Sequence, residues 1–272
     1  MAVIATFYDH IKEIARQEDR TVLDAMKLAR ECGVELLEVS ANSVIGREDE
    51  LGQELAAAEM GISAIPGYFD FGRDTDVHKQ CSPLLEAASF LGADRILVIP
   101  GFHEPEDSPE TREAHIQNME RCINELAEEA EKTGVTLVME DYDSVLSPFS
   151  TKEGLRRFLD NCPKLGCAFD TGNFQYMAQD SLSAYELLRG RITHVHLKDR
   201  IFQPDFGGKV KTAVDGTPLY PAPVGYGKMH IPEILELLKR DGYDGIYTME
   251  FYDAENTREI LEKSAAWLKA HL

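Results

Sequence analysis

The chain has 272 residues, 43% of them hydrophobic, and its 48 acidic against 28 basic residues give a formal net charge of −20. This composition can bury a substantial core and excludes an intrinsically disordered protein. The negative field argues against nucleic acid as a partner, because nucleic-acid binding draws on clustered Lys and Arg.

The sequence also indicates where the protein works. No apolar run reaches the roughly 18 residues of a membrane span. The opening MAVIATFYDH has neither the basic nor the long apolar segment of an export signal. Five cysteines, an odd number without a CxxC pair, argue against a disulfide framework and favour a reducing compartment. We therefore expect a soluble cytoplasmic protein without membrane association.

Strands and helices alternate along the chain. Short apolar runs rich in β-branched residues predict eight strands, at 2–7, 34–40, 61–69, 94–102, 135–142, 165–173, 192–199 and 245–252. Helical periodicity predicts eight helices, at 21–32, 50–60, 81–92, 111–132, 151–162, 183–190, 231–242 and 256–272. The clearest is 111–132, where Ile116, Met119 and Ile123 recur at spacings of three and four.

Eight strand–helix units in a chain of this length predict an α/β fold of the (β/α)8 TIM-barrel class, since such a barrel takes roughly 250 residues. The alternative, an open doubly wound sheet, usually carries a Gly-rich phosphate fingerprint after its first strand, and ATFYDHIKE has none. No Pro/Gly/Ser-rich linker divides the chain, so residues 1–272 are expected to form one domain. Residues 200–229, after the seventh strand, are expected to form a long functional or mobile loop.

Polar residues fall on alternate positions at the ends of the last four predicted strands. In a barrel, alternate strand residues point inward, and those near the carboxyl ends reach the mouth where chemistry is done. On the parity that turns aliphatic residues outward, four residues converge there: Glu140, Asp170, His196 and Glu250. Any one of them could instead be a capping or ion-paired residue, but four at neighbouring strand ends favour a site.

Three carboxylates in such a cluster would repel one another and suffer desolvation unless a cation compensates them. A divalent metal ion would do so. Oxygen ligands with one imidazole favour Mn²⁺, with Mg²⁺, Co²⁺ or Zn²⁺ as the other candidates.

Further candidates surround this cluster. His194 lies one inward step deeper than His196, which favours a hydrogen-bonded core histidine over a substrate contact. Lys198 lies one step nearer the mouth and could stabilise a negatively charged substrate oxygen or pair with a carboxylate. Glu38 is expected to bind a substrate hydroxyl, or else to pair with a basic residue of the barrel.

Aromatic and loop residues complete the set of candidates. Tyr142, Tyr252 and Phe7 could line the pocket or simply pack. His103, after VIPGF, is expected on an exposed loop, with little weight as a site residue.

The ordered motifs VMEDY, AFDTGN, HVHLKD, PVGYGK and GYDGIYTMEF resemble the sugar phosphate isomerase/epimerase family of xylose-isomerase-like TIM barrels, which also includes AP endonuclease family 2. The resemblance spans nearly the whole chain and is strongest over residues 135–252. It implies a metal held by Glu140, Asp170, His196 and Glu250, with Glu140 and Glu250 as the acid/base pair that flanks the substrate. Arg200 lies near, though not in register with, an arginine of the family's ketose epimerases.

The resemblance implies a divalent-metal-dependent isomerase or epimerase that acts on a sugar, keto-sugar or sugar phosphate, through a metal-stabilised enediolate. A lyase or dehydratase acting on a keto-sugar, inosose or keto-acid is the alternative, and a non-catalytic barrel or a DNA-repair endonuclease carries less weight. Family nucleases with three metals have a His three positions after the sixth-strand Asp, where this chain has Asn173. The expected partner is a small carbohydrate, and a homo-oligomer stays open.

Overall fold

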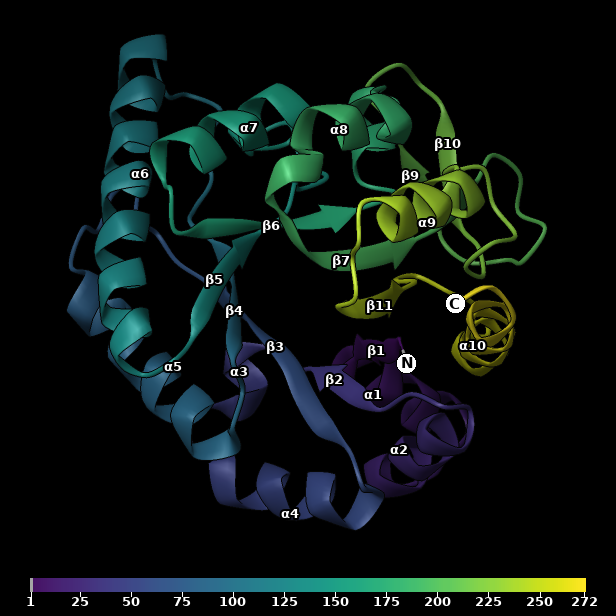
Figure 1. Ribbon diagram of the computed structural model, residues 1–272. Helices are drawn as coiled ribbons and strands as arrows, with labels where there is room; N and C mark the ends of the chain where they lie inside the picture. The colour runs from purple at the N-terminus through teal and green to yellow at the C-terminus, as the bar shows by residue number, and fades with distance from the viewer. Residues whose placement is uncertain (1) are drawn as a thin grey trace.

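The computed structural model describes residues 2–272, which form a closed barrel of eight parallel strands (Figure 1). The strands lie around the barrel in the order β1-β11-β7-β6-β5-β4-β3-β2. Their bounds are β1 Val3–Phe7, β2 Leu36–Glu38, β3 Gly61–Tyr68, β4 Arg95–Ile99, β5 Thr136–Met139, β6 Leu165–Asp170, β7 Ile192–Lys198 and β11 Ile246–Glu250. All eight fall within the predicted strands, and the predicted TIM barrel is confirmed.

Ten α-helices among the described residues surround the barrel (Figure 1). Eight correspond to the predicted helices: α2 Val22–Glu31, α4 Glu48–Ala58, α5 Val77–Leu91, α6 Pro109–Lys132, α7 Lys152–Asn161, α8 Ser181–Leu188, α9 Ile231–Arg240 and α10 Thr257–His271. Several start at a side-chain cap that the sequence carries, such as Thr151, which accepts a hydrogen bond from the backbone of Gly154.

Two helices were not predicted, α1 Tyr8–Gln17 and α3 Ala41–Val44. Helix α1 follows β1 directly, so no Gly, Pro or polar turn marks the boundary. Its buried face, with Tyr8, Ile11 and Ile14 at helical spacing, is the sequence signal that could have shown it.

Residues 200–229, expected to form a long loop after β7, contain regular secondary structure. They include a small antiparallel sheet of β8 Arg200–Ile201, β9 Lys211–Thr212 and β10 Pro218–Pro221, in the order β8-β10-β9. The carboxylate of Asp199 closes this segment by accepting hydrogen bonds from the backbone N–H groups of Gly225, Gly227 and Met229, at 2.9, 2.8 and 3.2 Å. Gly227 is required there, because a Cβ would lie 2.1 Å from Asp199 Oδ1.

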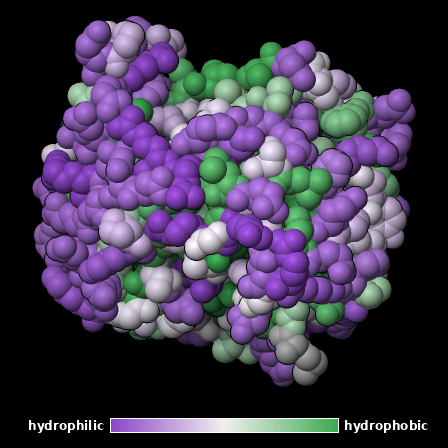
Figure 2. Space-filling model, turned by 45° about the horizontal axis from the view of Figure 1, so that its top comes forward, coloured by the Kyte–Doolittle hydropathy of each residue, from purple (hydrophilic) through white to green (hydrophobic). Residues whose placement is uncertain are grey.

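The apolar core lies between the barrel and its helices. Outward strand residues such as Val195 and Leu197 are fully buried against the helices, while the inward residues of the same strand, His194 and His196, are polar. Hydrophilic residues cover most of the face in Figure 2. Among residues 2–272, no helix is both long and apolar enough to cross a membrane.

Candidate metal centre and active site

Four side chains converge at the carboxyl ends of β5, β6, β7 and β11, which are neighbours in the barrel. Glu140, Asp170, His196 and Glu250 each offer one ligand atom, and these atoms all lie within 4.8 Å of one another. All four residues are buried, with at most 8% of any of them exposed. The structure therefore brings together the four residues that strand parity singled out.

Two carboxylate oxygens in this cluster lack the partners that burial demands. Asp170 Oδ1 accepts hydrogen bonds from the backbone N–H groups of Gly172 and Asn173, at 2.7 and 2.6 Å, which fixes the carboxylate. Asp170 Oδ2 and Glu250 Oε2 are buried without a hydrogen-bond partner in the described part of the chain. Unpaired buried oxygens are costly, and a divalent cation would satisfy both. The residues present therefore fit a bound metal ion.

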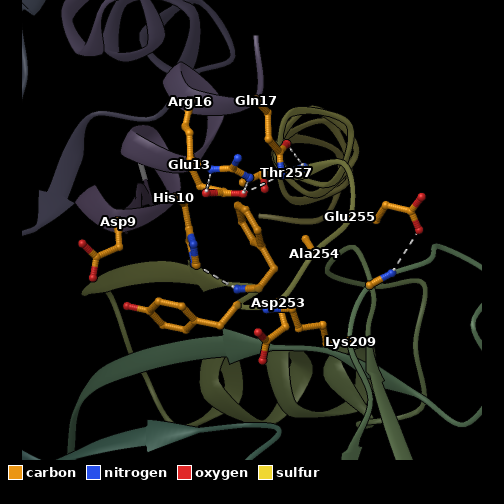
Figure 3. A pocket seen from close by; sticks show the side chains of 13 residues that line it. Asp9, His10, Glu13, Arg16, Gln17, Lys209, Asp253, Ala254, Glu255 and Thr257 are labelled. Atoms are coloured by element: carbon orange, nitrogen blue, oxygen red, sulfur yellow. Dashed lines mark hydrogen bonds and ion pairs between the residues drawn. The ribbon is translucent and has the colours of Figure 1, made fainter. Parts of the chain in front are cut away.

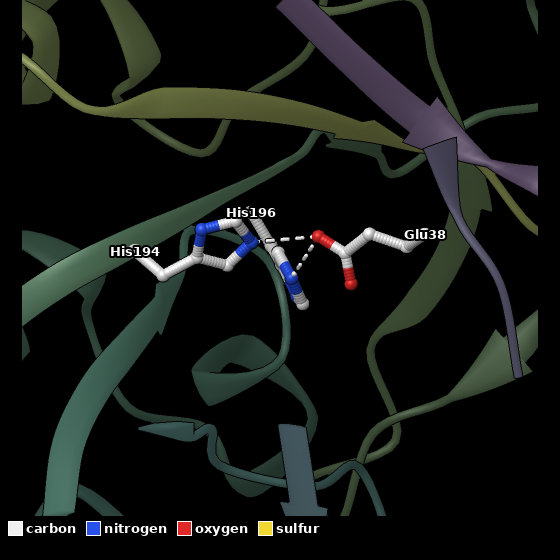
Figure 4. A group of neighbouring side chains, drawn as sticks. All are labelled: Glu38, His194 and His196. Atoms are coloured by element: carbon white, nitrogen blue, oxygen red, sulfur yellow. Dashed lines mark hydrogen bonds and ion pairs between the residues drawn. The ribbon is translucent and has the colours of Figure 1, made fainter. Parts of the chain in front are cut away.

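A second layer lies beneath the cluster and orients its histidine (Figure 4). Glu38 Oε1 accepts hydrogen bonds from Nε2 of His194 at 2.6 Å, from Nε2 of His196 at 3.0 Å and from Oγ1 of Thr248 at 2.7 Å. Nδ1 of His196 therefore faces the cluster, 2.7 Å from Glu140 Oε2. A carboxylate behind a ligating histidine is the usual device that fixes the ring and its tautomer.

Burial and like charges control the ionisation of the cluster. Burial raises the pKa of Asp170 to about 8 and raises the pKa of Glu140 above its ordinary value. Burial alone would lower the pKa of His196, but the carboxylates of Glu38 and Glu140 outweigh it and raise that pKa well above its usual range. In the metal-free protein, protons therefore supply part of the positive charge that the carboxylates need.

Lys198 supplies the rest of that charge. Its ammonium group forms an ion pair with Glu250 and donates a hydrogen bond to Oδ1 of Asn173 at 2.6 Å. Burial lowers the pKa of Lys198, but Glu250, Asp170 and Asp143 outweigh it and raise the pKa. Lys198 is 4% exposed, and its ammonium group lies against the buried carboxylate of Glu250.

A cavity of about 310 Å³ opens above the cluster. This volume lies at the lower end of the roughly 300–1,000 Å³ of small-ligand sites. Seven of the residues predicted for the site line it: Phe7, Glu140, Tyr142, Lys198, Arg200, Glu250 and Tyr252. The other four, Glu38, Asp170, His194 and His196, form the layer beneath. The contact of Glu38 with His196, whose pKa is raised, favours the ion-pair alternative for Glu38. The hydrogen bond between Glu38 and the buried ring of His194 favours the core alternative for His194.

Some residues of the cavity were missed by the sequence reasoning. Asp143 forms an ion pair with Lys211 of β9 at 2.6 Å and lies 3.8 Å from Arg200, so the segment after β7 contributes two basic residues to the wall. Tyr68, at the end of β3, and Asn173 also line the cavity. For Asn173, its position in DTGN three residues after Asp170 was a usable signal.

A larger cavity, of about 680 Å³, lies beside the barrel mouth between α1, the start of α10 and the segment at Gly208 and Lys209 (Figure 3). It shares Asp9, Tyr252 and Asp253 with the smaller cavity. Among its charged side chains, Arg16 forms an ion pair with Glu13 at 2.6 Å. The metal-ligand cluster belongs to the smaller cavity, which is therefore the candidate active site.

Comparisons with known proteins agree with the fold. The family model described as xylose isomerase-like TIM barrel matches residues 4–271. No curated protein matches the chain. The solved structures similar to it include the probable 3-DHS dehydratase AsbF of Bacillus anthracis, at 18% identity and a TM-score of 0.74, with 99% of each chain covered.

Two further structures are similar to the chain over nearly their whole lengths. The 3-keto-D-glucoside 4-epimerase YcjR of E. coli is 19% identical with a TM-score of 0.73, over 99% of this chain and 100% of that one. The IOLI protein, solved with a bound zinc atom, is 17% identical with a TM-score of 0.75, over 98% of this chain and 97% of that one. At these identities, the likeness concerns the fold.

Proposed function

Because the chain belongs to the xylose isomerase-like TIM barrel family, we propose that it is a divalent-metal-dependent isomerase or epimerase acting on a sugar, keto-sugar or sugar phosphate. The observation that carries this proposal is the buried group of Glu140, Asp170, His196 and Glu250 at the floor of a cavity of about 310 Å³. The similar structures include an epimerase and a dehydratase, which supports an enzymatic role in general.

The four residues of this group would hold the metal ion. Mn²⁺ suits three carboxylates and one imidazole, and Mg²⁺, Co²⁺ or Zn²⁺ are the alternatives. When bound, such an ion would polarise the carbonyl and adjacent hydroxyl oxygens of a sugar and make the neighbouring C–H group acidic.

Glu140 and Glu250 would move the proton. They come from β5 and β11, which are separated in the barrel by β6 and β7, so their carboxylates reach the cavity from two sides. One carboxylate takes the proton from one face of the substrate. Return by the other on the opposite face inverts a centre, and return to the adjacent carbon moves the carbonyl. The raised pKa of Glu140 brings this group closer to neutral pH, where proton exchange is most efficient.

The remaining lining residues would position the substrate. Lys198, held by Asn173 and Glu250, can donate a hydrogen bond to an oxygen that becomes negative. Phe7, Leu97 and Ile99 make part of the wall apolar, which limits water around the reacting carbon.

A lyase acting on a keto-sugar, inosose or keto-acid is the second candidate. It would begin with the same proton removal, and it differs in needing an acid for the leaving hydroxyl. The carboxyl group of Glu140, which lines the cavity and whose pKa burial raises, could provide that proton.

The test is incubation of the Mn²⁺-loaded protein with a panel of ketoses and 3-keto-sugars in D₂O. Deuterium in recovered isomers supports the isomerase or epimerase, and a new ultraviolet-absorbing enone supports the lyase. Glu140→Gln and Glu250→Gln should each lower the rate by at least about 10²-fold. Glu236→Gln, at a side chain that is 80% exposed, is the matched control and should keep full activity. Full activity in both site variants would refute the proposal.

A further inference from the structure

A second group of metal-ligand side chains lies outside the barrel mouth, where the segment after β4 meets helix α6. His103, Asp107 and His115 each offer one ligand atom, and these atoms lie within 4.8 Å of one another. His103 and Asp107 come from the connection between Ile99 and Pro109, and His115 comes from the second turn of α6. None of the three belongs to the cluster at the barrel mouth.

Both histidines carry buried nitrogen atoms that lack partners. His103, which was expected on an exposed loop, is 6% exposed, so that expectation is wrong. Nδ1 of His103 and Nδ1 of His115 are buried without a hydrogen-bond partner among residues 2–272. The two rings lie nearly parallel, with centroids 6.3 Å apart and 22° between their planes. Nδ1 of His115 lies 3.6 Å from Oδ2 of Asp107, beyond hydrogen-bond distance. An ion between these groups would satisfy them together.

The protein already holds the three residues in place. Asp107 Oδ2 accepts hydrogen bonds from the backbone N–H of Glu104 at 2.7 Å and from Arg73 at 3.3 Å. The backbone N–H of His103 donates to the carbonyl of Leu146 at 2.9 Å. Ser108 caps the N-terminus of α6, with the backbone N–H of Thr111 donating to its hydroxyl oxygen at 3.2 Å. Ligands fixed in this way lose little entropy when a metal binds.

The surrounding charges also allow a cation. Arg73 is shared among three carboxylates, those of Asp70, Glu104 and Asp107, at 3.2, 3.6 and 3.3 Å. The second nearby guanidinium, of Arg112, donates to the backbone carbonyls of Glu104 and Pro105. Three carboxylates thus face two guanidinium groups, which leaves a net negative charge for a metal ion to offset.

We propose that His103, Asp107 and His115 form a second divalent-metal site, of the two-histidine, one-carboxylate type that suits Zn²⁺ and leaves a fourth position for water. The inference goes beyond the proposed function, because it needs none of the residues of the barrel cluster. The site would stabilise one wall of the candidate active site. Phe102, next to His103, packs edge-on against Tyr142 of the cavity, with ring centroids 5.0 Å apart.

The test uses Zn²⁺ alone as the probe. Full-length protein is stripped with a chelator and titrated with Zn²⁺, and the bound zinc is counted after gel filtration. The wild type should bind two equivalents, and His115→Gln and Asp107→Asn should each bind one. Asp170→Asn, in the barrel cluster, should also keep one, and the combination with His115→Gln should bind none. His78→Gln, at an exposed histidine of α5, is the matched control and should bind two.

The two sites fail in different ways. If the Asp170→Asn protein binds no zinc, or if folded His115→Gln and Asp107→Asn proteins still bind two equivalents, the second site is refuted. If the wild type binds two equivalents of zinc and Asp170→Asn binds one, the lost equivalent belongs to the barrel cluster and the remaining one supports the second site. Circular dichroism shows whether His115→Gln and Asp107→Asn have folded. If they have not, the number of zinc ions bound by Asp170→Asn decides whether the second site exists. A zinc-edge anomalous peak between His103 and His115 in crystals would be the direct confirmation.

Discussion

Glu38 lies directly behind His196, and its Oε1 accepts a hydrogen bond from Nε2 of that ring at 3.0 Å. The opposite ring nitrogen therefore faces the candidate metal cluster, where Glu140 lies 2.7 Å from it. Glu38, which the sequence suggests as a substrate contact, thus lies in the structure behind a histidine of the candidate metal cluster. The two roles make different predictions.

Glu38→Gln should lower the affinity for Mn²⁺ by about 10- to 100-fold, the range found when the partner behind a ligating histidine is removed. The glutamine keeps the volume of the side chain but removes the charge that holds three donors. Titration calorimetry of the chelator-treated protein measures the change. Glu236→Gln is the control. A folded Glu38→Gln protein with wild-type metal affinity and a raised KM would instead support substrate binding by Glu38.

The period-2 pattern predicted the position around the barrel of each residue of the candidate metal cluster, but not the depth of its neighbours. Depth depends on strand register, which shifts between Leu37 and Glu38 and between Cys167 and Ala168. No local pattern reports these shifts, so Glu38 was expected at the mouth rather than beneath it. The small sheet after β7 was missed for a similar reason, because its strands are two to four residues long and contain or flank Pro and Gly.

The burial of His103 was also beyond the sequence. Its segment ends in Gly, Pro and acidic residues, which is typical of an exposed loop. His103 is buried between His115 of α6 and the distant loop at Leu146, whose carbonyl accepts a hydrogen bond from the backbone N–H of His103. The sequence therefore predicted the eight strands of the barrel and the convergence of Glu140, Asp170, His196 and Glu250, and missed contacts that depend on tertiary packing.

Metal binding at the barrel cluster should release at least one proton near neutral pH, because both Asp170 and His196 have raised pKa values. The pKa of Asp170 in the metal-free protein is about 8, so at pH 7 this carboxyl is mostly protonated. A metal ion binds the carboxylate, so binding displaces the proton and affinity rises as the pH increases from 6 to 8. Calorimetry in buffers with different ionisation enthalpies measures the released protons. Heats at pH 6.5 that are independent of the buffer would contradict the prediction.

His10 should make the metal-free protein less stable in acid. Its ring is 2% exposed, stacks on Phe251 with centroids 4.1 Å apart, and accepts a hydrogen bond from the backbone N–H of Phe251 at 3.0 Å. Burial lowers its pKa from 6.5 to about 3. The unfolded chain therefore binds a proton that the folded chain does not, and stability is lost as the pH falls from 6.5 towards 3.

Between pH 6.5 and 5, this single group should cost about 2 kcal/mol, since each pKa unit corresponds to about 1.4 kcal/mol. Urea unfolding of the wild type and of His10→Gln, both in EDTA, gives the comparison. The variant should have the flatter dependence on pH, while His78→Gln should keep the wild-type slope. Equal slopes in wild type and His10→Gln would mean that His10 is not the responsible group.

Asp199 should hold the segment that carries Lys211 to the cavity. Its Oδ2 accepts from the N–H groups of Gly225 and Gly227, and its Oδ1 from those of Met229 and Arg200. Asp199→Asn keeps the shape of the side chain but replaces one carboxylate oxygen with an NH2 group. That group is a donor, and it would face two backbone N–H groups that need an acceptor. Each buried N–H group left without an acceptor costs about 1–3 kcal/mol, so the variant should lose at least about 2 kcal/mol.

That loss has two forms that can be measured separately. Global destabilisation appears in urea unfolding, and local opening appears as faster proteolysis between residues 200 and 229 with little change in the unfolding midpoint. Either result would support the role of the Asp199 carboxylate in holding residues 200–229 in place. Asp215→Asn, at an exposed aspartate whose Oδ1 accepts from the N–H of Thr217 at 2.9 Å, should change stability by less than about 0.5 kcal/mol. If the two variants behave alike in both measurements, the segment is held by its own small sheet rather than by Asp199.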